Sequence, residues 1–132
     1  MQRILLWFRT RRKYALVERF RKSAVQKEAL LYFTRRDVRV HAKCEKEMRK
    51  CAKALLNRDQ EWFESFRNLM FDSEPAVRLS VAAEFLSRGD TQAKTVLEDI
   101  RDDGGLTGYT AKLVLYSDSQ GSLKSPFRMK SR

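Results

Sequence analysis

The sequence has few residues that interrupt helices, crosslink chains or bind metals: 5 Gly, 2 Pro, 2 Cys and 1 His among 132 residues. So little Gly and Pro, beside 42% hydrophobic residues, excludes a collagen-like or disordered polymer. The longest apolar runs, residues 4–8 and 29–33, are far shorter than the roughly 18 residues that span a bilayer. Sustained alternation of apolar and polar residues, the sign of strands, is also missing. We therefore expect one all-α domain that can bury its own core.

The two cysteines and the single histidine point to no redox or metal chemistry. Cys44 and Cys51 stand on one predicted helix, about 10.5 Å apart along its axis, which is too far for a disulfide. They are interpreted as buried thiols, and no zinc-ligand spacing exists, so we expect no metal and no cofactor. His41 lies near Cys44 without a third group to orient it, which disfavours a nucleophile pair. Residues 1–13 lack the apolar region and cleavage site of a signal peptide, so a cytoplasmic protein is expected.

Apolar residues recur at every third or fourth position, the period of amphipathic helices. In residues 14–33, Leu16, Phe20, Ala24 and Leu31 predict a long helix, whose start is left open between residues 4 and 14. The later stripes are Val40, Cys44, Met48, Cys51 and Leu55; Trp62, Phe63, Phe66, Leu69 and Met70; Val77, Val81, Ala82, Phe85 and Leu86; Ala93, Val96, Leu97 and Ile100; and Leu106, Tyr109, Leu113 and Tyr116.

Capping residues divide these helices into hairpins. Asn57 or Asp59 can cap one helix, Pro75 suits the first turn of the next, and Gly89 followed by Asp90 ends one helix and starts another. The short links predict two antiparallel hairpins, 59–88 and 90–117, each the size of an α-solenoid repeat. We expect one domain over 1–117, with a basic helical part at 1–58, and a flexible basic tail at 118–132.

The run "LMFDSEPAVRLSVAAEFL" at 69–86 resembles the HEAT-repeat consensus. In that consensus an Asp closes the first helix, Val-Arg opens the second and two small residues follow; Asp72, Val77, Arg78, Ala82 and Ala83 occupy these places here. The resemblance implies an α-α superhelix of about six or seven helices, HEAT-like in its second half. Residues from about 16 to 116 resemble a small bacterial HEAT-like family of unknown function, which implies a fold and no activity.

Asp72 and Arg78 have a structural interpretation. A carboxylate in this turn can accept backbone amide hydrogens of the following helix and face the Arg78 guanidinium. The pair would then hold the hairpin's geometry, with Val77 in the core, and take no part in a reaction.

Charge is unevenly distributed along the chain. Residues 1–58 hold 18 Lys or Arg against 5 acids, residues 59–117 hold 6 against 11, and the tail holds 4 against 1. Like charges three or four residues apart in a helix repel each other, so an excess this large suggests an acidic partner. The residues that we expect to contact it are Arg35, Arg36, Arg39, Lys43, Lys46 and Lys50.

These features favour a non-enzymatic binding module with an acidic protein as its partner. Basic surfaces accelerate encounter with negative charge, and no recognisable catalytic constellation is present. Asp59, Glu61 and Glu64 lie near Trp62, yet acids in a first helical turn are ordinary. An adaptor or a toxin-neutralising, immunity-type protein in bacteria would fit; the oligomeric state is left open.

Three alternatives remain. The basic residues of the N-terminal half, interleaved with Trp7, Phe8, Tyr14 and Tyr32, could bind nucleic acid by phosphate contact and base stacking. No nucleic-acid motif is present, and HEAT-like DNA glycosylases are longer solenoids. An enzyme of another kind is also conceivable. Finally, residues 1–13 could lie on a membrane surface, but their apolar residues form a block more than a stripe, which favours a helix that caps the core.

Overall fold

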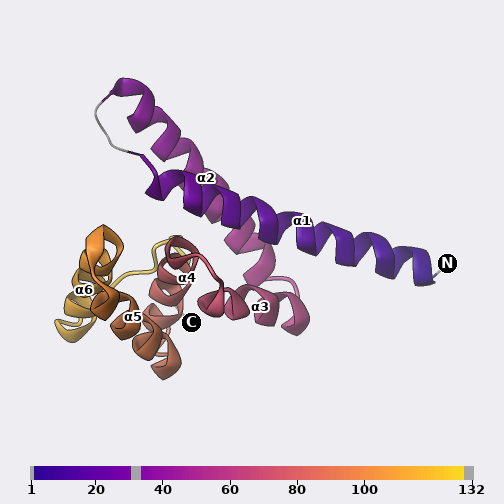
Figure 1. Cartoon of the computed structure of the whole chain (residues 1–132). Coiled ribbons are helices and arrows are strands. Elements are labelled where there is room, and N and C mark those ends of the chain that lie inside the picture. The colour runs from indigo at the N-terminus through magenta and orange to yellow at the C-terminus, as the bar shows by residue number, and fades with distance from the viewer. Residues whose placement is uncertain (1, 31–33, 130–132) are drawn as a thin grey trace. The chain divides into compact units, whose positions relative to one another are not determined.

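The computed structural model describes residues 2–30 and 34–129, which contain no strand. The helices are α1 (Gln2–Glu28), α2 (Arg35–Leu56), α3 (Gln60–Arg67), the 3-10 helix η1 (Asn68–Phe71), α4 (Pro75–Ser87), α5 (Thr91–Asp103) and α6 (Gly105–Ser119). The all-α prediction is confirmed (Figure 1). Within the described ranges no helix has the length and apolar character needed to cross a bilayer. Internal contacts divide the chain into two units, Met1–Phe66 and Arg67–Arg132.

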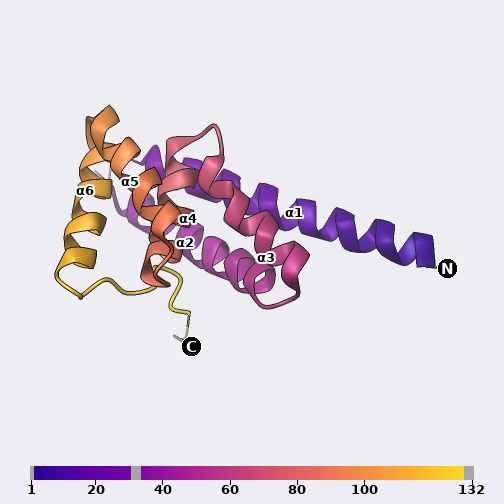
Figure 2. The ribbon, with the colours of Figure 1, turned by 90° about the horizontal axis from the view of Figure 1, so that it is seen from below.

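The first unit is built on an antiparallel pair, α1 and α2 (Figures 1 and 2). α1 is one continuous helix from Gln2, so the long N-terminal helix starts before residue 4. Its inward residues, Leu16, Phe20 and Ala24, are buried. They belong to a core completed by Cys44, Met48, Cys51, Ala52, Leu55, Leu56, Trp62 and Phe66. The predicted Leu31 and the aromatic Tyr32 lie outside the described residues.

The start of α3 is set by a side-chain cap. Asp59 Oδ1 accepts a hydrogen bond from the Trp62 backbone N–H at 3.0 Å, which satisfies a donor that has no partner within the helix. Of the two candidate caps, Asp59 is therefore the one that acts here. Further along α3, the Phe66 ring packs edge to face against the Phe20 ring of α1, with centroids 5.0 Å apart. This contact packs α3 against α1.

The second unit contains α4, α5 and α6, consecutive helices that contact one another. Pro75 is the first residue of α4, and Asp90 caps α5 by accepting hydrogen bonds from Gln92 N–H and Ala93 N–H, so both predicted helix starts are confirmed. Gly108 of α6 lies against the end of α5: a Cβ built there would stand 3.0 Å from the Ile100 carbonyl oxygen. The absence of a side chain thus allows α6 to approach α5 closely.

The segment after α6 packs against α4, unlike the loose tail that the sequence suggests. Phe127 is only 5% exposed. Ser125 Oγ donates a hydrogen bond to Glu84 Oε1 at 2.6 Å, and Glu84 is fully buried. Ser87 Oγ lies 2.5 Å from the Glu84 main-chain oxygen and 3.0 Å from the other carboxylate oxygen. In Figure 1 the yellow segment accordingly returns from α6 toward α4.

The unit boundary crosses one predicted hairpin, which stays a prediction, and the exposure of α6 differs from its expected stripe. The boundary between units falls inside the hairpin predicted for 59–88, so nearly all of α3 belongs to the first unit and α4 to the second. The apolar stripe of α6 does not form core: Leu106, Tyr109, Leu113 and Tyr116 are exposed, while the small residues Gly108 and Ala111 are buried. The single domain over 1–117 stays a prediction.

Candidate macromolecule-binding surface

The six predicted contact residues lie on one exposed face of α2. Each of Arg35, Arg36, Arg39, Lys43, Lys46 and Lys50 is exposed, and Lys53 continues the series. At about 100° per residue these seven side chains fall within an arc of about 100°, over about 27 Å of helix axis. We call them the α2 basic stripe. Lys53 was not among the predicted contacts, although the alternating spacing of three and four residues extends to it.

The opposite face of α2 packs on α1, and ion pairs border this apolar seam. Arg19 pairs with Glu47, and Lys27 Nζ lies 3.0 Å from Glu45 Oε1. Burial raises the pKa of Glu45, but the hydrogen bond from Lys27 and the positive charges of Lys27, His41 and Arg49 outweigh it, so the pKa lies below its ordinary value. Acidic residues of α2 are thus engaged at the seam with α1, as flanking charges are in coiled coils.

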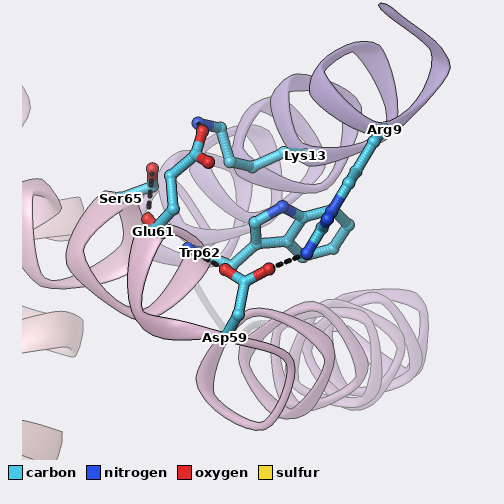
Figure 3. A network of polar contacts seen from close by, with 6 residues as sticks. All are labelled: Arg9, Lys13, Asp59, Glu61, Trp62 and Ser65. Atoms are coloured by element: carbon cyan, nitrogen blue, oxygen red, sulfur yellow. Dashed lines mark hydrogen bonds and ion pairs between the residues drawn. The ribbon is translucent and has the colours of Figure 1, made fainter. Parts of the chain in front are cut away.

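The acids of α3 and its cap are engaged in the same way. Asp59 pairs with Arg9, and Glu61 Oε1 lies 2.9 Å from Lys13 Nζ (Figure 3). The hydrogen bond from Trp62 N–H lowers the pKa of Asp59; burial opposes this, and Arg9 and Arg58 add to the lowering.

The α2 basic stripe has no such compensation. Within residues 2–30 and 34–129, none of its seven side chains forms an ion pair or a side-chain hydrogen bond. The positive charge of the first unit is therefore partly neutralised internally, at α1 and α3, and left unpaired along the outer face of α2.

Asp72, Val77 and Arg78 lie at the start of α4, away from the stripe in the sequence and in the other unit. Asp72 Oδ2 accepts a hydrogen bond from Glu74 N–H at 3.0 Å, as expected for a carboxylate at this turn. Arg78 Nη1 donates to the main-chain oxygen of Asp72 at 2.9 Å and to that of Ser73 at 3.3 Å. Val77 is fully buried. These contacts hold the turn before α4.

Both cysteines are free thiols and are buried. Burial raises the pKa of Cys44 and of Cys51, against the lowering effect of Lys27 on the first and Arg19 on the second, and a raised pKa disfavours the thiolate form. His41 Nε2 lies 3.6 Å from Glu45. In the part of the chain that the structure describes, no three His, Cys, Asp or Glu residues are grouped as a metal site would require.

The first turns of α1 carry a feature that the sequence interpretation missed. Ile4, Leu5, Trp7 and Phe8 are all exposed, so this segment does not cap the core. In Figures 1 and 2 the helix runs on past α2 and α3. The spacing of residues 4, 7, 8 and 11 is that of one face of a helix, so the sequence did contain a sign of this exposed face. The unbroken apolar run at 4–8 obscured it, because it has the pattern of a block and not of a stripe.

Comparison with models of protein families, with curated proteins and with solved structures finds no match to this chain. The described residues form two units of packed α-helices, which is compatible with a helical repeat, and the HEAT-like identity stays a prediction.

Proposed function

We propose that this chain is a non-enzymatic binding module that holds an acidic protein against the α2 basic stripe. The observation that carries the proposal is the contrast within α2: Glu45 and Glu47 are paired with cations of α1, while seven cations on the outer face have no partner among the described residues. Each cation has a like-charged neighbour three or four residues away, and an anionic surface would relieve this repulsion.

The spacing of the stripe supports an extended acidic partner. Cations at intervals of three and four residues match carboxylates at the same intervals on a second helix laid alongside. Residues 35–56 contain no Phe, Trp or Tyr, so the stripe lacks the aromatic platform with which proteins stack single-stranded bases. An adaptor or an immunity-type inhibitor would use such a surface, and we place both within the proposal.

We propose further that α4 and the turn before it belong to a HEAT-like repeat that acts as scaffold. Support comes from the turn: Asp72 accepts the Glu74 amide, Pro75 opens α4, and Arg78 binds two carbonyl oxygens of the turn. Ala82 and Ala83 are buried, as the small pair of the consensus would be.

The test compares the wild-type chain with the triple variant Arg36→Glu, Arg39→Glu, Lys43→Glu in affinity capture from the source cell, with and without nuclease. We expect nuclease-resistant capture of one acidic protein, lost in the triple variant, and an unchanged circular dichroism spectrum. A matched control is Lys94→Glu, Lys112→Glu, which alters exposed lysines of the second unit. A partner that binds the triple variant as tightly as the wild type would refute the assignment of the stripe.

Nucleic acid is the second candidate, and the charge of residues 1–58 favours it. Titration with duplex and single-stranded oligonucleotides at two salt concentrations separates it from protein binding. A steep loss of affinity with salt, at micromolar or better affinity, would mark phosphate contacts. Flat titrations together with nuclease-resistant capture would support the acidic protein.

A further inference from the structure

α1 has two apolar faces that point in opposite directions. At about 100° per residue, Leu16, Phe20 and Ala24 share one side of the helix with Arg9 and Lys13. The other side carries Ile4, Trp7, Phe8, Arg11 and Tyr14, in an arc centred about 180° away. A helix with one core face would place polar residues here, so this second apolar face requires its own explanation.

The second face is held outward by contacts on the first. Arg9 pairs with Asp59 and Lys13 with Glu61, and both cations reach from α1 toward α3 (Figure 3). Lys13 is itself buried, with an exposure of 8%. These contacts fix the rotation of α1 about its axis. Ile4, Trp7, Phe8 and Tyr14 consequently remain 61%, 54%, 59% and 62% exposed.

The charge around this face is of one sign. Residues 1–17 contain Arg3, Arg9, Arg11, Arg12 and Lys13 and no acidic residue. Of these, Arg3, Arg11 and Arg12 are exposed and form no ion pair with any described residue. Large apolar side chains flanked by unpaired arginines are the composition of helices that lie in the interface of an anionic bilayer.

The ring geometry favours lipid over nucleic acid. Trp7 and Phe8 meet edge to face, with centroids 4.9 Å apart and an interplanar angle of 75°, and the Arg11 guanidinium lies 5.1 Å from the Trp7 centroid. A stacking platform needs open ring faces, whereas one face of Trp7 is covered. Ile4 and Leu5 add aliphatic surface that bases do not use. In a bilayer, the arginine stems can bury while their charged ends reach the headgroups.

We propose that the first turns of α1, residues 3–14, dock onto a membrane surface that carries anionic phospholipid headgroups. The helix lies in the plane of the interface: Ile4, Trp7 and Phe8 enter the acyl boundary, Tyr14 stays at headgroup level, and Arg3, Arg11 and Arg12 contact lipid phosphates. This site is separate from the α2 basic stripe and does not depend on the function proposed for it.

The experiment is co-sedimentation of the full chain with vesicles of phosphatidylcholine alone or mixed with phosphatidylglycerol, at low and high salt. We expect binding to the mixed vesicles, weakened by salt, and little binding to phosphatidylcholine alone. The double variant Trp7→Ser, Phe8→Ser should bind at least about tenfold more weakly, because two large apolar side chains leave the interface. The double variant Arg11→Glu, Arg12→Glu should lose about as much vesicle affinity, since each cation near an anionic surface strengthens binding about fivefold.

The matched control is Tyr109→Ser, Leu113→Ser, which removes exposed apolar surface from α6, where it lacks flanking arginines. This control should bind like the wild type. Circular dichroism should show that all variants are folded, since none of the altered residues is buried.

Equal binding to both vesicle types would overturn the proposal. The proposal would also be overturned if the Trp7→Ser, Phe8→Ser variant bound the mixed vesicles as tightly as the wild type. The same holds if the α6 control lost as much vesicle affinity as this variant. Without vesicle binding, an oligonucleotide complex abolished by the α1 variant would assign the face to nucleic acid. An oligomer that this variant dissociates would assign it to a second copy of the chain. Either result refutes lipid docking.

Discussion

Replacing Lys46 by Glu should stabilise the protein while weakening its proposed binding. Lys46 has three cationic neighbours at helical contact spacing: Lys43, Arg49 and Lys50. Each like-charge pair costs about 0.2–0.5 kcal/mol, and an opposite pair gains about the same. Reversing three pairs therefore changes stability by about 1–3 kcal/mol, and solvent screening of exposed pairs favours the lower end. Arg49 adds a further reason, because its buried Nε lacks a hydrogen-bond partner.

The assay is thermal unfolding followed by circular dichroism and by tryptophan fluorescence. Both tryptophans, Trp7 and Trp62, belong to the first unit, so fluorescence reports on the unit that carries the substitution. A gain of about 1 kcal/mol corresponds to a rise in Tm of about 3–5 °C for a chain of this size. The rise should nearly vanish in 1 M salt, where the Debye length is about 3 Å.

Two further variants isolate the electrostatic cause. Lys46→Gln removes the repulsion without adding attraction and should give about half of the effect. Lys112→Glu makes the same charge reversal on α6, where positions 108, 109, 115 and 116 carry no charge, and should leave Tm unchanged. A lower Tm for Lys46→Glu, or a gain that persists in 1 M salt, would show that the unpaired charge of the stripe costs the fold nothing.

Three other predictions concern the packing of each unit. Glu84→Ala removes the carboxylate that accepts from the Ser125 hydroxyl, so we expect a loss of about 1–3 kcal/mol in urea unfolding and faster tryptic cleavage after α6; wild-type cleavage would contradict the anchoring. Asp59→Asn removes a carboxylate whose pKa is lowered in the folded protein. The stability that this lowering contributes is present above the ordinary Asp pKa of about 4 and is lost as pH falls below it. Acid titration of stability should therefore show the two proteins converging as pH falls below about 4, and a constant difference would refute the linkage. Gly108→Val should cost about 1–3 kcal/mol through contact with the α5 backbone, and a neutral result would show that α6 can shift.

Much of the fold was predictable because its signals are local. The cap at Asp90, the proline at Pro75 and the apolar period of residues 40–55 each act within one or two turns of helix, and the structure places the helices there. Asp72 accepting the Glu74 amide is another contact within a few residues. The exposure of the six predicted stripe residues follows from the same period, since they lie opposite the apolar positions of α2.

Contacts between distant residues were not predictable in this way. Glu84 accepts a hydrogen bond from Ser125, 41 residues later, and nothing near either residue in the sequence indicates the pair. Tyr109 and Tyr116 have the spacing of a core stripe, yet Gly108 and Ala111 are the buried residues, because close approach to α5 selects the small side of α6.

The sequence by itself determined where α3, α4 and α5 begin, which faces of the helices are apolar or cationic, and that positive charge gathers in the first half of the chain. These properties depend on backbone hydrogen bonds and side-chain period within single helices. Only the tertiary structure decided which apolar faces become core and which cations are neutralised. Ion pairs such as Lys13 with Glu61 and Arg19 with Glu47 join helices far apart in the sequence, and they leave the outer faces of α1 and α2 unpaired.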